Sequence, residues 1–184
     1  MSSSDRVAAQ AIPPADDAVA RLYAELAELR KRVHALEDER ELRDLLTRYS
    51  FGADVYRGPD WVRLFTPDGQ YELGTDNVEG AYNGSFAGAD ELLALITGPG
   101  MPAEGRSQHH HGPMVFRVDG DGASAESYSI TYLLGDDGAT RVFCAGFSRW
   151  SFQRVDGRWR ITERHRRELG ADDVAALIGA PDAR

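Results

Sequence analysis

A chain of 184 residues with 42% hydrophobic and 28% charged side chains has the composition of a globular protein and can fill one core of ordinary size. Its formal net charge of -9 argues against nucleic acid or an anionic membrane as a partner, because both require a basic face. The single Cys144, the lack of a membrane-length apolar run and an N-terminus without a signal-peptide core predict a cytoplasmic protein without disulfides.

The first predicted element is a long helix that follows a Ser-, Ala-, Pro- and Asp-rich, disordered lead-in over residues 1–17. Five apolar residues recur at alternating steps of four and three, which is the seam of a coiled coil: Leu22, Leu26, Leu29, Val33 and Leu36. The next seam positions are Arg40 and Arg43, while a new apolar stripe runs from Leu42 to Tyr49. We therefore predict an arm over residues 18–38 that docks on a partner subunit, followed by a core helix. One long helix packed on its own domain is the alternative.

Short elements are predicted between this helix and residue 100. Gly58-Pro59 ends the first helix, and Asp60 can cap a short helix that carries Trp61, Leu64 and Phe65 before a turn at Pro67-Asp68-Gly69. A strand over residues 70–73 and a weaker one over 78–83 precede a third helix over 90–96, which ends at Gly98-Pro99-Gly100.

The remaining chain has the pattern of a sheet. Strands at about 109–118, 123–134, 140–153 and 158–168 are separated by Asp-Gly turns, which are strong hairpin signals. Hairpins in succession make an antiparallel sheet, and the preceding helices must cover one face of it. The sequence therefore predicts an α+β domain over residues 39–170, with a short C-terminal helix and tail over 171–184.

Three of the five histidines are adjacent, at His109, His110 and His111, just ahead of an apolar strand. Such a run can be a metal site, a proton-transfer site or a solvated loop end. With unbroken alternation along the strand, His110 shares the face of Met114, whereas a bulge at Gly112-Pro113 would reset the phase. We rank His109 first, His111 second and His110 third as the residue that faces a pocket.

A metal site is the less favoured interpretation of these histidines. Adjacent imidazoles on a strand point to opposite faces, so only His109 and His111 could share an ion, and His165 would have to join them. No cysteine is placed to help, and the sequence has no His-Glu-x-x-His helix. We predict neither a metal nor a cofactor.

A set of short motifs follows the predicted elements in order: Leu45-Leu46-Thr47-Arg48-Tyr49, Leu64-Phe65-Thr66-Pro67-Asp68-Gly69, Val118-Asp119-Gly120-Asp121-Gly122-Ala123 and Asp156-Gly157-Arg158-Trp159-Arg160-Ile161. With them the chain resembles, from about Leu36 to Glu168, the SnoaL-like family of the nuclear-transport-factor-two-like (NTF2-like) superfamily. The resemblance implies a strongly curved antiparallel sheet that forms a cone, with three helices over one face. The N-terminal helical arm predicted from the apolar seam is added to this fold. It says less about the reaction, because this fold hosts dehydratases, isomerases, cyclases, hydrolases and binding modules.

The resemblance also implies a candidate site. In relatives that resemble scytalone dehydratase and hexachlorocyclohexane dehydrochlorinase, an aspartate late in the first core helix holds a histidine that transfers a proton. The matching residues here are Asp54 and His109. A carboxylate on one ring nitrogen fixes the tautomer and stabilises the imidazolium. We therefore expect a cofactor-free lyase or isomerase, dehydratase- or cyclase-like, acting on a small polyketide-like or aromatic hydroxy-carbonyl compound, with Tyr49 and Tyr56 donating hydrogen bonds to it.

Further side chains are candidates for substrate binding: His111, His110, Tyr128, Trp61, Phe65, Arg164 and His165. Trp61 is equally expected in the core, and the basic run from Arg164 to Arg167 fits a solvated strand end. Two alternatives stay open: a non-catalytic small-molecule-binding or oxygenase-associated subunit of the same fold, and a metal-dependent enzyme that uses the histidines. The expected partners are a small-molecule substrate and further copies of the chain, in a dimer or trimer, but neither nucleic acid nor a membrane.

Overall fold

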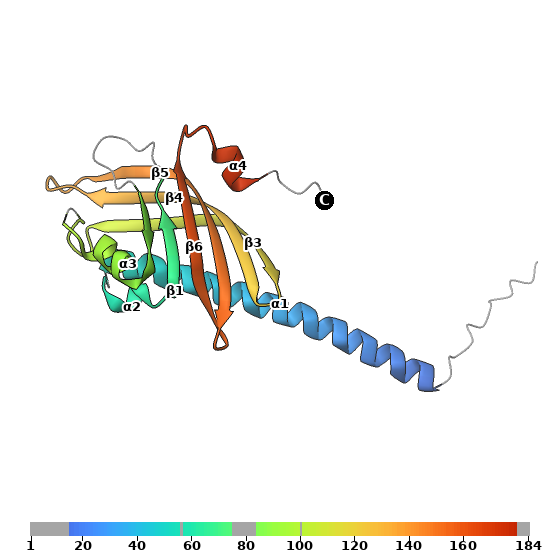
Figure 1. Cartoon of the computed structure of the whole chain (residues 1–184). Helices are drawn as coiled ribbons and strands as arrows, with labels where there is room; N and C mark the ends of the chain where they lie inside the picture. Colours follow the sequence, from blue (N-terminus) through green and yellow to red (C-terminus); the bar gives the residue numbers. More distant parts are fainter. Residues whose placement is uncertain (1–14, 56, 75–83, 100, 180–184) are drawn as a thin grey trace, which may run out of the picture. The chain divides into compact units, whose positions relative to one another are not determined.

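The computed structural model describes residues 15–55, 57–74, 84–99 and 101–179. The elements are α1 (Ala15–Val55), α2 (Pro59–Val62), β1 (Phe65–Glu72), β2 (Ser85–Ala87), α3 (Gly88–Thr97), β3 (Ser107–Asp119), β4 (Gly122–Leu134), β5 (Thr140–Val155), β6 (Arg158–Glu168) and α4 (Val174–Ile178) (Figure 1). The chain divides into two compact units, Met1–Glu37 and Asp38–Arg184. In the described part of the chain, no helix is both long and apolar enough to cross a membrane.

One six-stranded sheet organises the second unit, in the order β2-β1-β6-β5-β4-β3. The four long strands β3 to β6 pair antiparallel in succession, which confirms the predicted series of hairpins. The turn between β5 and β6 has positive φ at both Asp156 and Gly157, as the type I′ turn of a two-residue hairpin requires. The sheet curves strongly (Figure 1), and the fold is the predicted α+β cone.

The core lies between the helices and the inner face of this sheet. α1 contributes a buried stripe from Leu42 to Ala53, and α3 contributes Leu92 and Ile96. They pack in one cluster with Trp150 of β5, which is fully buried. Gly52 allows α1 to approach α2 closely, because a Cβ at this position would lie 2.6 Å from Cδ1 of Trp61.

The structure corrects the sequence-based prediction between residues 59 and 87. The short helix ends at Val62, and Phe65 begins β1 instead of belonging to that helix. Pro67-Asp68-Gly69 is not a turn but part of β1, where the register with β6 shifts between Phe65 and Gln70. Such an irregularity leaves room for proline, which cannot donate to the ladder. β1 also pairs parallel with β6, and β2 was not predicted; the predicted strand over 78–83 lies outside the described residues.

In the first unit, α1 presents the predicted coiled-coil seam as a row of exposed apolar side chains. Their exposed fractions range from 39% at Leu26 to 67% at Leu36. The helix is continuous between Leu36 and Leu42, where the apolar stripe changes face. The predicted arm and core helix are therefore two segments of one helix.

Candidate active site

The site is built around a contact between the end of α1 and the start of β3. Asp54 lies in the last turn of α1, and its Oδ1 is 2.7 Å from Nδ1 of His109 on β3. The backbone N–H of His109 donates to Oδ2 of the same carboxylate at 2.9 Å, and the Ser107 hydroxyl donates to Oδ1 at 3.1 Å. The backbone N–H of Gly105 also donates to the carbonyl oxygen of Asp54 at 2.8 Å. This network holds both the carboxylate and the imidazole in place.

These contacts determine the charge of Asp54. Burial raises the pKa of its carboxyl group, but the hydrogen bonds from the His109 ring, the His109 backbone and Ser107 outweigh burial and leave the pKa below its usual 3.8. The group is therefore an ionised carboxylate at neutral pH and can only accept hydrogen bonds. In a neutral His109, Nδ1 therefore carries the ring proton and donates it to the carboxylate. Nε2 is then the ring nitrogen that can accept a proton from a ligand.

A bulge in β3 decides which histidines face inward. His109 and His111 pair with Thr131 and Ser129 on the buried face of β4, and His110 is exposed on the opposite face. The register shifts between His111 and Met114, so that Gly112 and Pro113 together oppose one residue of β4. His109 and His111 thus share the inner face with Met114 in spite of the odd spacing. This matches the phase reset considered from the sequence.

His111 is enclosed by aromatic rings. Its ring centroid is 5.1 Å from that of Trp150 and 5.7 Å from that of Tyr49. Neither ring nitrogen has a hydrogen-bond partner in the described part of the chain, and both are shielded from solvent although the residue keeps some exposed surface. Burial, followed by the positive charge of Arg164, lowers the pKa of His111 well below 6.5. The residue is therefore a neutral imidazole, and it borders a hollow between α1 and β3.

Arg164 is a second polar centre on the inner face, from β6, and is only 1% exposed. Its guanidinium donates to the hydroxyls of Tyr49 and Tyr71, and to Oγ of Ser129 and of Ser148 at 3.2 Å each. Burial raises the pKa of Tyr49 well above 10 despite the nearby guanidinium. A cation held by four neutral hydroxyl groups keeps a positive potential that no carboxylate in this network cancels.

The interpretation of the run from Arg164 to Arg167 as a solvated strand end is therefore wrong for Arg164 and Arg166. Alternation along β6 places Arg164 and Arg166 on the inner face, where both are buried. His165 and Arg167 point to the other face, where Nδ1 of His165 is 2.6 Å from the Glu72 carboxylate. His165 consequently lies on the opposite side of the sheet from His109 and His111.

A cavity of about 350 Å³ joins these groups. Its polar lining includes Ser107, His109, Arg164 and Arg166. Its apolar lining includes residues of α3, the following loop, β4 and β5: Leu95, Ile96, Pro99, Met101, Pro102, Leu133, Phe143 and Cys144. His109 also borders a second hollow of about 400 Å³ between α1 and β3. A larger and more open depression of about 830 Å³ lies by the β4–β5 turn, and neither His109 nor Asp54 lines it. The candidate substrate cavity is therefore the one shared by the imidazole and the two arginines.

Comparison with known proteins agrees with the fold. The sequence profile of the SnoaL-like domain matches residues 34–165 of the chain. The chain belongs to the SnoaL-like family. An uncharacterised protein of Mycobacterium tuberculosis is 29% identical over 133 residues, which cover 72% of this chain and 86% of the relative. The family match spans Asp54, His109 and Arg164 and ends just before Arg166.

Two solved structures from Novosphingobium aromaticivorans are similar to this SnoaL-like domain. An NTF2-like protein with a cystatin-like fold is 28% identical, with a TM-score of 0.73 over 84% of this chain and 97% of the other. A proposed scytalone dehydratase is 19% identical, with a TM-score of 0.60 over 82% of this chain and 96% of the other. At that identity the second likeness shows the fold alone.

Three of the other predicted site residues, Trp61, Phe65 and Tyr128, do not line the cavity. Trp61 and Phe65 are buried in the core, and Nε1 of Trp61 donates to the carbonyl oxygen of Tyr49 at 3.1 Å. Tyr128 is 51% exposed on the outer face of the sheet, beside Phe147. Tyr56 lies outside the described residues. Among the described side chains, no group of three or more His, Cys, Asp or Glu residues is arranged to hold a metal ion.

Several site residues were not predicted from the sequence. Ser107 and Tyr71 line the cavity, and Ser129 and Ser148 hold Arg164 from β4 and β5. The available signal was the alternation of the strands, since all four sit in phase with inward-facing neighbours. A small hydroxyl among apolar residues of a strand is not distinctive enough to be singled out.

Proposed function

We propose that this domain is a cofactor-free lyase or isomerase, dehydratase- or cyclase-like, which transfers a proton between His109 and a small polyketide-like or aromatic hydroxy-carbonyl compound. The observation that carries the proposal is the 2.7 Å contact between Asp54 and His109 at the wall of a largely apolar cavity. A cavity of about 350 Å³ is near the lower end of the range for small-molecule sites and suits a compact substrate.

In a dehydration, Nε2 of His109 removes a proton from the carbon next to the substrate carbonyl, and the C–H electron pair moves into the enolate. The enolate then expels the hydroxyl group from the neighbouring carbon. The departing hydroxyl group takes the proton from the imidazolium and leaves as water. In the net change one C–H bond and one C–O bond are broken, and one C=C π bond and one O–H bond of water are formed. Asp54 stabilises the imidazolium through Nδ1 during the interval.

The arginines favour a substrate that develops negative charge on oxygen. Arg164 and Arg166 line the same cavity as His109, and both are buried. Because Arg166 pairs with Glu168 at 2.9 Å, the charge of Arg164 is the one available to a substrate. A cation fixed at low exposure stabilises an enolate oxygen more than a neutral carbonyl, and such preorganised charge lowers the barrier. Tyr71, which lines the cavity and accepts from Arg164, is better placed to donate to the substrate than Tyr49, which is absent from the lining.

The test is a panel of small hydroxy-ketones assayed with wild type, His109→Ala, Asp54→Asn and His110→Ala. We expect His109→Ala to lower kcat/KM by a factor of about 10² to 10⁴, which is the usual contribution of a positioned acid–base group. His110 is the matched control, because it neighbours His109 but is exposed on the other face. Wild-type activity in His109→Ala would refute the proposal. Ligand binding by all four proteins without turnover would favour the non-catalytic binding module.

A further inference from the structure

The exposed seam of α1 has no role in the proposed chemistry. Six apolar side chains of the first unit form it, with exposed fractions between 39% and 67%: Val19, Leu22, Leu26, Leu29, Val33 and Leu36. A helix of this kind is stabilised mainly by packing its apolar stripe, because isolated helices are marginal in water. An aligned row of large apolar side chains on a helix therefore indicates an interaction surface.

The residue types along the seam favour a two-stranded coiled coil. In heptad notation Val19, Leu26 and Val33 occupy the a positions, and Leu22, Leu29 and Leu36 occupy the d positions. Valine at a with leucine at d favours parallel dimers, because a β-branched side chain packs well at the a layers of two strands. The seam thus favours a single second helix of the same pattern.

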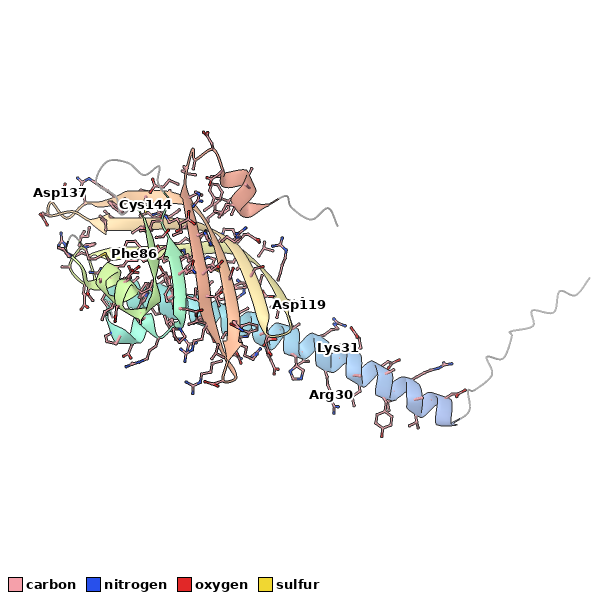
Figure 2. The ribbon with its side chains drawn as sticks, in the orientation of Figure 1. Arg30, Lys31, Phe86, Asp119, Asp137 and Cys144 are labelled. Carbon is pink, nitrogen blue, oxygen red and sulfur yellow. The ribbon has the colours of Figure 1, made fainter. Side chains whose placement is uncertain are left out.

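The flanking charges favour a second copy of the chain in parallel. Glu25 and Arg32 are at g positions, and Arg30 and Glu37 are at the e positions five residues further on. In a parallel, in-register pair each g residue faces the next e residue of the other helix. Glu25 therefore faces Arg30, and Arg32 faces Glu37. Each contact occurs twice in the dimer, once on each side. The Arg30 side chain projects freely from α1 (Figure 2). In an antiparallel pair that matches Leu26 with Leu29, Glu25 would instead face Arg32 of the other helix. Arg30 and Glu37 would then have no oppositely charged partner across the pair.

The seam also ends where the folded domain begins. The next a and d positions are Arg40 and Arg43. Arg43 makes its contacts within the Asp38–Arg184 unit. It pairs with Glu39 at 2.6 Å, and its guanidinium carbon lies 4.9 Å from the centroid of the Phe116 ring. The segment left for a partner therefore spans Val19 to Leu36.

From these observations we propose that residues 19–36 of two copies of this chain form a parallel, in-register, two-stranded coiled coil. The proposal is independent of the function of the cavity. It specifies a homodimer, one orientation of the helices and one register, and each of these can be tested separately on the intact 184-residue chain.

Orientation and register are tested by cysteine crosslinking. Leu22→Cys places a thiol at a d position near one end of the seam, where a parallel pair brings the two copies face to face. In the antiparallel pair the two residues would be eleven positions apart along the axis, or about 16 Å, beyond the reach of a disulfide. Ala24→Cys is the matched control, because it lies two residues away at an exposed f position. The natural Cys144 is buried, and wild type controls for it.

Under mild oxidation we expect most of Leu22→Cys to run as a covalent dimer, with wild type and Ala24→Cys remaining single chains. Circular dichroism before oxidation verifies that the variants keep their helix. An uncrosslinked Leu22→Cys with wild-type helicity overturns the proposal, and so does equal crosslinking of Ala24→Cys.

Charge reversal tests the choice of a second copy. Arg30→Glu turns both contacts with Glu25 from attractive to repulsive, and we expect the dimer dissociation constant from analytical ultracentrifugation to rise about tenfold. Glu25→Arg combined with Arg30→Glu restores opposite charges and should recover the wild-type value. Lys31→Glu is the control, because Lys31 is at an f position next to Arg30. Equal weakening by Lys31→Glu, or no rescue by the double variant, contradicts the proposed pairing.

Discussion

Replacement of His111 by phenylalanine should make the protein less sensitive to acid. In the wild type, protonation of His111 would place a cation beside Arg164, between the rings of Tyr49 and Trp150, where no described residue accepts its hydrogen bonds. The folded state therefore keeps this imidazole neutral, with its pKa well below 6.5. Phenylalanine retains a ring between Tyr49 and Trp150 but has no titrating group.

The sign and size of the effect follow from proton linkage. Below pH 6.5 the unfolded chain binds a proton on His111 that the folded chain does not, so the free energy of unfolding falls as the pH falls. For an unfolded pKa of about 6.5 the loss relative to pH 8 is at most about 1.4 kcal/mol at pH 5.5 and at most about 2 kcal/mol at pH 5.0, limits that are reached when the folded pKa lies below this range. The contribution of neutral His111 is thus fully present above pH 6.5 and decreases below it.

The assay is urea denaturation at several pH values between 5 and 8, followed by circular dichroism. As the pH is lowered, the free energy of unfolding of wild type should fall relative to that of His111→Phe, by up to the stated amounts. This change is expected whatever the difference between the two proteins at pH 8. His110→Phe is the matched control, since the same chemical change is made on an exposed neighbour. Parallel pH curves for wild type and His111→Phe would refute the burial of a neutral imidazole at this position.

Three further substitutions probe the hydrogen-bond networks and the packing. Asp54→Asn should lower the free energy of unfolding at pH 7 by about 1–3 kcal/mol, because it weakens the contacts with His109 and Ser107. Since the folded pKa of Asp54 is depressed, this difference in urea denaturation should persist above pH 3.8 and shrink below it; a difference that grows in acid would contradict the assignment. Arg164→Met should cost about 2–5 kcal/mol by the same assay, because the cation and its four hydroxyl contacts are lost together, and a neutral result would show that the hydroxyls pair with one another instead. Gly52→Ala should lower stability by about 1–3 kcal/mol in thermal denaturation, because the added methyl group would overlap Trp61, whereas Ser50→Ala on the same helix should have a smaller effect.

The parts of the fold that depend on local chemistry could be predicted from the sequence. The hairpins follow from Asp-Gly turns, whose backbone preference acts over two residues. The parallel pairing of β1 with β6 joins residues nearly a hundred positions apart, and no local pattern indicates it. The short β2 was missed for a similar reason, since three residues are too few to show alternation.

The same division applies to the candidate site. Asp54 and His109 could be paired in advance because the family resemblance supplied a long-range relation that residue patterns lack. Arg164 was a candidate for substrate binding, but its basic run also fitted a solvated strand end, since an arginine in such a run is normally exposed. Its burial depends on hydroxyl groups from α1, β1, β4 and β5, which meet only in the folded chain. The polarity of a side chain predicts its exposure poorly when its partners come from four other elements.

The bulge at Gly112 and Pro113 has a consequence for alignments of this family. Deleting one of the two residues would give a regular strand in which His109 and His111 still face inward, whereas deleting both would bring His110 inside. Consider a relative that lacks one of these two residues and is aligned to this chain without a gap from Met114 backwards. Its counterpart of His109, which faces inward, would then be aligned with the exposed His110. Assignments transferred by column number would then miss the imidazole that contacts Asp54, although every histidine had been retained.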